Sequence, residues 1–274
     1  MDISMQIAIL GGGNIGTAIA KGLVASGKLS SKQITITRRK IHLLDALAQQ
    51  GFVIQADNCE AVRHSKIIII AVTPQNLVKL IEEIRSELIP SKHIIVSIVS
   101  GVSISEIIRH IGKNVPVVRA MPNIAIAIRE SMTCIAYNQD TKKDVLDLVN
   151  GLFDSVGKTL VINEDLMISA TALCGCGIAF FLRSIRAASQ GGIEIGFHAD
   201  DALMMTAQTA KGAASLLLNS ENHPEAEIDK VTTPMGCTIA GLNQMEHQGF
   251  SSAMIKGIIT SAEKAAELYS NDRK

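Results

Sequence analysis

Three glycines near the start of the chain have the spacing of a phosphate-binding loop. Gln6–Gly16 contains the short apolar run Ile7–Leu10 followed by Gly11-x-Gly13-x-x-Gly16, and apolar residues then recur at helical spacing. In such a strand–turn–helix unit the first glycine makes the turn, the second admits a pyrophosphate, and the third lets the helix pack on the strand. The helix N-terminus adds free N–H groups and partial positive charge. The pattern predicts a dinucleotide site, with an ordinary glycine turn as the alternative.

The residues after the second predicted strand, Ile34–Thr37, indicate which dinucleotide binds. An NAD enzyme usually carries Asp or Glu about 20 residues after the glycines, bonded to the ribose 2′-OH. Here Thr37 stands at that position and is followed by Arg38 and Arg39. A carboxylate would repel a 2′-phosphate, whereas a hydroxyl and cationic donors would bind it. The cluster favours NADP(H), with NAD(H) left open as a second cofactor; a solvated basic turn is the alternative.

The second half of the chain contains two glycine-interrupted segments, Leu173–Gly177 and Thr232–Thr238. In the later one, Pro234 fixes the entry to a predicted helix and Gly236 keeps the backbone open. Thr238, close to the helix start, can cap it or present its hydroxyl. A helix start of this kind can hold a carboxylate. An ordinary capped turn explains the spacing equally well.

Cys174 and Cys176 resemble a metal-binding pair, and Cys237 with a histidine could complete a zinc site. The sequence has no second paired motif, however. Small buried residues beside glycines are the favoured interpretation, and no metal site is predicted. A Ser/His/Asp elbow and a Walker lysine are also absent from the sequence.

Alternating strand and helix patterns predict an α/β fold with an open, doubly wound sheet over residues 1–161. Beyond the two strands above, the predicted strands are Val53–Gln55, Lys66–Val72, Ile94–Val99, Val115–Arg119, Met132–Ala136 and Thr159–Val161, with a helix over Lys142–Phe153. After Val161 the strand pattern stops, and residues 162–274 are expected to form an all-α domain. Its predicted helices are Leu166–Leu173, Ile178–Gln190, Ala199–Asn219, Glu225–Val231, Thr238–His247 and Ser251–Ser270.

Composition narrows the possible partners. The 274 residues include 26 Lys+Arg and 26 Asp+Glu, so charge gives no argument for nucleic acid or a membrane surface. Leu166–Leu182 is uncharged but shorter than the ~20 residues a membrane span needs, so a buried helix is expected.

Five cysteines and no signal-peptide pattern favour a reduced, cytoplasmic protein. Helices that are apolar nearly all round favour a homodimer, with further assembly left open.

Taken together, the motifs resemble the pyrroline-5-carboxylate reductase family over essentially the whole chain. The resemblance rests on Gly11–Gly16 with Asn14, Ala71-Val72-x-Pro74-Gln75, Val96-Ser97-Ile98 before Gly101-Val102, Arg119-Ala120-Met121-Pro122-Asn123, Met132-Thr133, Gly175-x-Gly177-x-Ala179, Lys211-Gly212-Ala213, His223-Pro224 and Thr233-Pro234-x-Gly236-x-Thr238. It implies a Rossmann domain followed by a helical dimerisation domain that interlocks with its twin. The active site would lie between the domains. Hydride would pass from NAD(P)H to the C5 imine carbon of L-1-pyrroline-5-carboxylate, giving L-proline in the last step of proline biosynthesis.

The resemblance also implies roles for individual residues. Thr238 would be catalytic, with its Oγ hydrogen-bonded to the ring nitrogen. The backbone N–H groups of Gly236, Cys237 and Thr238 would hold the substrate carboxylate, and Asn123 and Cys176 would also bind substrate. The implied cofactor residues are Gly11, Gly13, Asn14, Ile15, Gly16, Thr37, Arg38, Arg39, Asn58, Ala71, Val72, Thr73, Pro74, Ala120 and Pro122. Because an imine carries its own basic nitrogen, a dedicated side-chain acid is not required.

The chain departs from the family pattern at several positions. The family usually has Ser-Gly-Ser-Gly-Pro-Ala-Tyr where this chain has Cys174–Phe180, and Gly-Gly-Thr-Thr where it has Met235–Thr238. Ile124-Ala125 replaces the usual Thr-Pro, and Thr73 the common Lys. Three alternatives stay open: a reductase of a related cyclic imine, a 3-hydroxyacid reductase with Lys211 as its acid, and a non-catalytic NADP(H)-binding protein.

Overall fold

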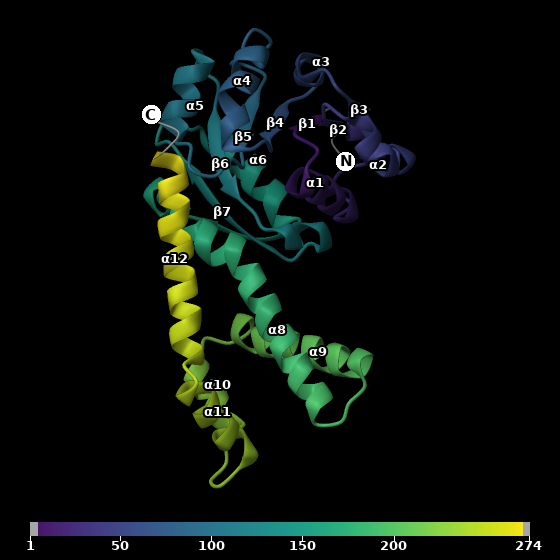
Figure 1. Ribbon diagram of the computed structural model, residues 1–274. Helices are drawn as coiled ribbons and strands as arrows, with labels where there is room; N and C mark the ends of the chain where they lie inside the picture. The colour runs from purple at the N-terminus through teal and green to yellow at the C-terminus, as the bar shows by residue number, and fades with distance from the viewer. Residues whose placement is uncertain (1–4, 271–274) are drawn as a thin grey trace. The chain divides into compact units, whose positions relative to one another are not determined.

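Eight strands form one sheet in the structure, a computed structural model that describes residues 5–270 (Figure 1). Their spatial order is β3-β2-β1-β4-β5-β6-β7-β8. The strands are β1 (Ile7–Leu10), β2 (Ile34–Thr37), β3 (Val53–Gln55), β4 (Ile67–Ile70), β5 (Ile94–Ser97), β6 (Val117–Met121), β7 (Ser131–Tyr137) and β8 (Gly157–Val161). From β3 to β6 all neighbours are parallel. The predicted α/β fold is confirmed.

Helices cover both faces of this sheet because its central strands are apolar on both sides. Ile7 and Ile9 pack in the cluster that includes α1 (Asn14–Ala25) and α6 (Lys143–Asp154). Ala8 and Leu10 point to the opposite cluster, formed with α3 (Asn58–Arg63), α4 (Pro74–Ile84) and α5 (Ile104–Ile111). The shorter helical segments of this half are η1 (Ser31–Gln33), η2 (Ile41–Leu44) and α2 (Asp45–Gln49).

The strand β7 reverses the sheet direction: it runs antiparallel to β6, and β8 then pairs parallel with β7. The short link η3 (Ile124–Ile128) explains the reversal, because a parallel return needs a crossover of about a dozen residues or more. The strand β6 also lies two residues later than the predicted Val115–Arg119 and reaches Met121. This shift places Met121 opposite Cys134 of β7.

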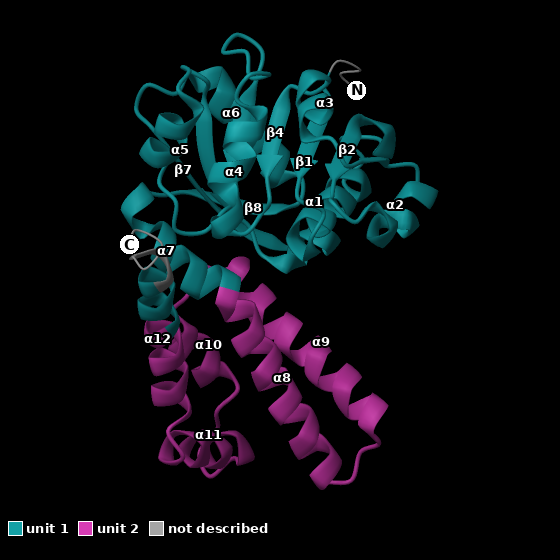
Figure 2. Cartoon of the chain, turned by 45° about the horizontal axis from the view of Figure 1, so that its top comes forward, with its two compact units in different colours: residues 1–175, 261–274 teal, residues 176–260 magenta. Residues whose placement is uncertain are grey.

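The chain divides into two compact units, residues 1–175 with 261–274 and residues 176–260 (Figure 2). The second unit contains α8 (Gly177–Glu194), α9 (Ala199–Leu218), α10 (Pro224–Lys230) and α11 (Cys237–His247). The segments η4 (Glu164–Leu166), α7 (Met167–Ala170) and the π-helical η5 (Thr171–Cys176) precede it, and α12 (Phe250–Ser270) follows. The expected domain boundary after Val161, where β8 ends, stays a prediction.

Many large apolar side chains of the second unit are exposed in the single chain. Phe181 is 63% exposed, Leu218 77% and Ile195 78%. Soluble monomers rarely expose apolar surface on this scale, and such patches usually mark an interaction surface. The exposure therefore indicates that these helices meet a partner.

The run Glu164–Glu194 is the one helix among the described residues that is long and apolar enough to cross a membrane. It spans 31 residues, and 22% of its most apolar stretch is buried. The expectation that this segment is too short to span was wrong, because the helix continues through η5 into α8. The expectation of a buried helix was also wrong for the single chain, in which Phe181 is 63% and Leu182 58% exposed. Length and composition alone are weak support for a span, since helices of soluble proteins pass the same test.

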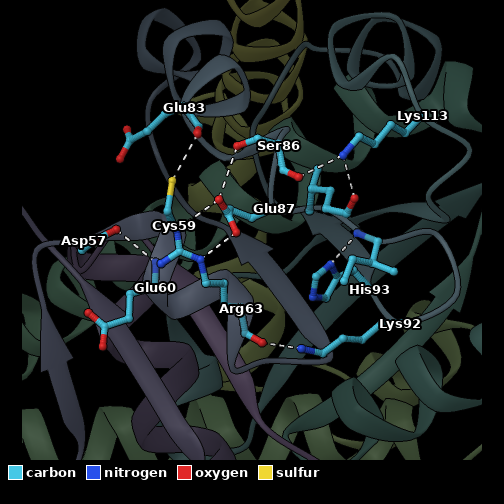
Figure 3. A network of polar contacts seen from close by, with 12 residues as sticks. Asp57, Cys59, Glu60, Arg63, Glu83, Ser86, Glu87, Lys92, His93 and Lys113 are labelled. Carbon is cyan, nitrogen blue, oxygen red and sulfur yellow. Dashed lines mark hydrogen bonds and ion pairs between the residues drawn. The ribbon is translucent and has the colours of Figure 1, made fainter.

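A buried histidine lies in a polar network between α3, the end of α4 and β5 (Figure 3). His93 is 1% exposed, and its Nδ1 accepts a hydrogen bond from the Ile89 N–H at 2.9 Å. Burial, and then the charges of Lys92 and Lys113, hold the pKa of His93 below its usual value. Nearby, Arg63 binds both oxygens of Glu87, at 2.7 and 3.1 Å, which lowers the pKa of that carboxyl.

Because the pKa of His93 is lowered in the folded protein, the unfolded chain binds more protons at acidic pH. We expect the contribution of neutral His93 to the free energy of unfolding to be complete above the unfolded pKa of about 6.5. This contribution should be lost as the pH falls below that value. The loss has a slope of at most ~1.4 kcal/mol per pH unit and levels off below the folded pKa. Denaturant unfolding between neutral and acidic pH measures this slope.

The substitution His93→Asn keeps an acceptor near the Ile89 N–H but does not titrate, so it should remove this component of the pH dependence. His64→Asn, at a neighbouring exposed position, is the matched control and should leave the slope unchanged. An unaltered slope in the His93 variant would show that other groups cause the acid sensitivity.

Candidate functional site

The glycine loop after β1 is held against the end of β2 by its backbone. The N–H groups of Gly11 and Gly12 both donate to the Thr37 carbonyl, at 3.2 and 2.7 Å. Gly11 has a φ of +120°, which a side chain would strain. Gly13 is the N-cap of α1, and an added Cβ there would have no heavy atom within 4 Å. The loop is therefore open at Gly13, as the predicted approach of a pyrophosphate requires.

Two further glycine positions bring backbones together. A Cβ on Gly16 would lie 2.1 Å from the Gly11 carbonyl oxygen, and a Cβ on Gly11 would lie 2.4 Å from the Ala71 oxygen. The Ala71 N–H also donates to the Leu10 carbonyl at 2.8 Å. The predicted segment Ala71–Pro74 thus lies beside the glycine loop. Its Thr73 and Pro74 are the N-cap and the first residue of α4.

The glycine loop lies at the topological switch point of the doubly wound sheet. The strand β1 lies between β2 and β4, so the chain leaves it toward opposite edges of the sheet. Ligands of such sheets bind outside the carboxyl ends of the strands at this switch point. The start of α1 adds the exposed Asn14 and half-buried Ile15, both predicted to bind the cofactor. Together these residues can hold the pyrophosphate of a dinucleotide.

Polar side chains meet at the end of β2. The Thr37 hydroxyl donates to Asn58 Oδ1 at 2.6 Å, and Asn58 Nδ2 donates to Glu83 Oε1 at 3.1 Å. Arg38 Nη1 donates to the Gly12 carbonyl at 2.8 Å. Two predicted cofactor residues, Thr37 and Arg38, therefore contact the glycine loop, a third, Asn58, contacts Thr37, and Arg39 is exposed. The Thr37 hydroxyl points to Asn58, so it orients that carboxamide.

The end of β6 is buried. Ala120 is fully buried, Pro122 is buried and Asn123 is 8% exposed. The Asn123 carboxamide is engaged at both ends: Oδ1 accepts from the Ala125 N–H at 3.1 Å, and Nδ2 donates to the Cys174 carbonyl at 3.2 Å. These contacts give Asn123 a structural role in linking β6 to η5. Its role in binding substrate stays a prediction.

In the second unit, the turn Thr233–Gly236 leads into α11. Gly236 is the N-cap, and its N–H donates to the Thr233 carbonyl at 2.9 Å. A Cβ on Gly236 would lie 2.4 Å from the Thr233 hydroxyl, so the turn needs a glycine here. No side chain caps the helix, and its first turn has no acidic residue. Cys237 and Thr238, the first two residues of α11, can thus offer their N–H groups to a carboxylate.

Met235 adopts a backbone conformation that is uncommon for its type. Its φ is +61°, in the left-handed region, and its side chain is fully exposed. With Pro234 before it, Met235 occupies the position of a tight turn where glycine or asparagine is usual. A methionine there costs about 1–3 kcal/mol of backbone strain.

Two of the cysteines, Cys174 and Cys176, lie in the segment η5. Cys176, a predicted substrate residue, is half-buried at the end of η5. Its neighbour Cys174 packs against the small apolar cluster that contains Cys134 of β7, a residue that sequence reasoning missed. No spacing pattern could have revealed this packing, because β7 and η5 are separated by α6 and β8. Among residues 5–270, no group of three or more His, Cys, Asp or Glu side chains could hold a metal.

A cavity of about 570 Å³ lies between α4 and α5 in the first unit. It is lined by Pro74, Leu77, Val78, Gly101, Val102, Ser103, Ser105, Glu106, Arg109 and His110. It shares only Pro74 with the predicted cofactor residues and does not include the glycine loop. Pro74, the first residue of α4, thus borders both this cavity and the segment beside the glycine loop.

Two family models match the chain. Residues 6–101 match the family described as NADP oxidoreductase coenzyme F420-dependent. The matched residues include the glycine loop and the strands β1 to β5. Residues 164–268 match the family described as pyrroline-5-carboxylate reductase dimerisation. The matched residues include the apolar helices and the start of α11.

Individual proteins similar to this chain have names that match the second of these families. The chain is 52% identical to pyrroline-5-carboxylate reductase 1 of Dictyostelium discoideum over 98% of its own length, but it spans only 50% of that relative. It is 50% identical to pyrroline-5-carboxylate reductase 2 of the same organism, over 96% of this chain and 92% of the relative. The crystal structure of Plasmodium falciparum pyrroline carboxylate reductase with NADP bound has the same fold, with a TM-score of 0.86 and 23% identity, over 97% of this chain and 98% of that one.

Gly13 and Gly16 offer a matched pair of substitutions, because only one of them has space for a side chain. Gly16→Ala should lower stability by about 1–3 kcal/mol, since its Cβ meets the Gly11 carbonyl. Gly13→Ala should leave the melting midpoint near that of the parent but weaken NADPH binding at least tenfold, about 1.4 kcal/mol. Thermal unfolding and NADPH titration distinguish the two. Unchanged NADPH affinity in the Gly13 variant would refute the proposed pyrophosphate position.

Proposed function

The chain belongs to the pyrroline-5-carboxylate reductase family, and from that premise we propose that it reduces L-1-pyrroline-5-carboxylate to L-proline with NADPH as hydride donor, the last step of proline biosynthesis. The observation that carries the proposal is the uncapped start of α11 at Gly236, in a chain that also has the open glycine loop at Gly13. The first can hold a carboxylate and the second a dinucleotide.

The residues at the switch point fit NADPH. Gly13 leaves room for the pyrophosphate, and the start of α1 supplies N–H groups to it. At the end of β2, where the ribose 2′-position is expected, Arg38 contacts Gly12 and Asn58 contacts Thr37, and no carboxylate follows β2 directly. Glu83 is bonded to Asn58, so its charge is partly engaged. NAD(H) is the second cofactor that we propose to test.

The reaction needs little from the side chains beyond binding and orientation. Bound NADPH supplies the hydride. The N–H groups of Cys237 and Thr238 at the start of α11 anchor the substrate carboxylate, and the Thr238 hydroxyl hydrogen-bonds the ring nitrogen. The imine nitrogen is basic and takes its proton from water. Thr238 therefore positions the ring, and no acidic side chain is needed.

A second copy of the chain is the partner that we propose for the exposed apolar helices. The segment Glu164–Glu194 lies within the dimerisation match over residues 164–268. An interface with a second copy would bury Phe181 and its apolar neighbours. Burial in such an interface would also explain why this long helix is apolar although it does not cross a membrane. We accordingly propose a homodimer located in the cytoplasm, with no membrane or nucleic-acid partner.

The 3-hydroxyacid reductase alternative requires a lysine acid at a helix start in the second unit. Lys211 lies well inside α9 and is exposed. Its position favours the imine reductase. Lys211→Ala should abolish a hydroxyacid reductase but only weaken an imine reductase.

The first assay follows the loss of nicotinamide absorbance with pyrroline-5-carboxylate and either NADPH or NADH, beside a panel of other cyclic imines and 3-oxoacids. Turnover of pyrroline-5-carboxylate, faster with NADPH, is the expected result. Turnover of only another imine or an oxoacid would show that pyrroline-5-carboxylate is not the substrate. Saturable NADPH binding without any turnover would indicate a non-catalytic binding protein.

Thr238→Ala tests the positioning role. It should lower kcat/KM for the imine 10- to 1000-fold, about 1.4–4 kcal/mol, because the ring nitrogen loses its partner. The KM for NADPH should stay the same. Thr238→Ser keeps the hydroxyl and should recover most of the activity. Equal activity of the Ala and Ser variants would remove Thr238 from the mechanism.

The double substitution of Arg38 and Arg39 to Ala tests cofactor choice. The KM for NADPH should rise about tenfold or more and that for NADH much less, since only NADPH carries the 2′-phosphate. Lys40→Ala, which removes an adjacent exposed charge, is the control. Equal losses with both cofactors would assign the arginines to the glycine loop, which Arg38 contacts at Gly12.

A further inference from the structure

A line of hydrogen bonds connects an exposed carboxylate on α4 to the buried end of β2. Glu83 Oε1 accepts from Asn58 Nδ2 at 3.1 Å, and Asn58 Oδ1 accepts from the Thr37 hydroxyl at 2.6 Å. Glu83 is exposed, Asn58 is half-buried and Thr37 is 2% exposed. The Thr37 carbonyl also binds the glycine loop, so the line ends beside the predicted cofactor site.

The direction of each hydrogen bond in this line follows from the carboxylate. A carboxylate only accepts hydrogen bonds, so Asn58 must turn its NH₂ group toward Glu83. The Asn58 carbonyl oxygen then faces Thr37, and the Thr37 hydroxyl must donate to it. A hydroxyl has a single proton, so Thr37 offers only lone pairs to any further group. Glu83 therefore sets the polarity of a side chain that it does not touch.

Contacts between α3 and α4 fix the position of Glu83 (Figure 3). The Cys59 thiol donates to the Glu83 carbonyl at 3.2 Å. One helical turn further along both helices, Arg63 binds the two carboxylate oxygens of Glu87 at 2.7 and 3.1 Å. These contacts hold the two helices in register, so the Glu83 side chain leaves α4 from a fixed place beside Asn58.

The 2′-group of a bound dinucleotide would meet two opposed influences here. Arg38 and Arg39 supply cationic donors that suit a phosphate, although Nη1 of Arg38 is already bonded to the Gly12 carbonyl. The lone pairs of Thr37 and the negative charge of Glu83 disfavour a phosphate. A ribose 2′-hydroxyl has a proton to donate and carries no charge, so the same two groups do not disfavour it.

We propose that Glu83 is a specificity-determining residue, which limits the advantage of NADPH and allows NADH to bind as well. It acts through the orientation of Asn58 and through its own charge. The proposal rests on the proposed function, because it requires a dinucleotide at the switch point. Asp57, the acidic residue next to Asn58 in the sequence, caps α3 instead and accepts from the Glu60 N–H at 3.0 Å.

The experiment measures the affinity of the parent protein and of Glu83→Gln for NADPH and for NADH by titration calorimetry. Glutamine keeps the length of the side chain but has no charge, and its amide can bond to either end of the Asn58 carboxamide. NADPH should bind about threefold more tightly or better to the variant, while the affinity for NADH should change by less than about twofold. Glu82→Gln removes the same charge from the preceding exposed position of α4 and is the matched control.

An unchanged ratio of the two affinities in Glu83→Gln, or weaker binding of NADPH, would overturn the proposal. An equal change in Glu82→Gln would also overturn it, because the effect would then belong to the charge of the whole helix. A parent protein that binds neither dinucleotide would do the same. The titrations need no imine, so a protein that binds NADPH without reducing pyrroline-5-carboxylate would refute only the proposed reaction.

Thr37→Val tests whether the hydroxyl transmits the effect. Valine keeps the shape of the side chain but has no proton or lone pair to offer. In this background Glu83→Gln should improve NADPH binding less than it does in the parent. A gain of the same size would show that the hydroxyl has no part in the selection. The melting midpoint of Glu83→Gln should stay near that of the parent, and a lower midpoint with an unchanged affinity ratio would assign Glu83 a structural role only.

Discussion

Close contact between backbones at the carboxyl ends of β1 and β4 is the constraint on which the cofactor half depends. Gly16 lies against the Gly11 carbonyl, and Gly11 against that of Ala71, at separations that exclude a Cβ. These contacts hold α1 on the sheet with its N-terminus at the switch point. The one glycine of the motif with open space, Gly13, is the one where a ligand must approach. Packing and binding thus use different glycines of the same motif.

A short polar network lies at the end of β2, where we propose that the cofactor is selected. Arg38 binds the Gly12 carbonyl, so the residue expected to meet a 2′-phosphate also supports the phosphate loop. Thr37 orients Asn58, which is itself anchored on Glu83 of α4. Three elements that are distant in sequence therefore fix the donors before any cofactor binds. Such preorganisation lowers the entropy that binding must overcome.

The second unit differs from the first in how much of its apolar surface is buried within the single chain. Its helices leave large apolar side chains exposed, because the single chain has no further layer to cover them. At the start of α11 the turn retains a glycine N-cap and a strained methionine, so the N–H groups of the first turn stay uncapped by a side chain. Exposed apolar patches usually mark interaction surfaces, and backbone strain often lies at functional sites.

Local pattern by itself determined the approximate positions of the strands, of most helices in the second half of the chain and of the glycine loop, because these follow from apolar periodicity and from backbone conformations that only some residues adopt. It could also identify Thr37–Arg39 and Gly236–Thr238 as candidate site residues. Only the tertiary structure decided that β7 runs antiparallel, that Arg38 reaches Gly12, that the Asn123 carboxamide is engaged, and that Cys174 packs against the cluster containing Cys134. These contacts join residues distant in the chain, and no spacing rule encodes them, since they depend on how the sheet and its helices pack.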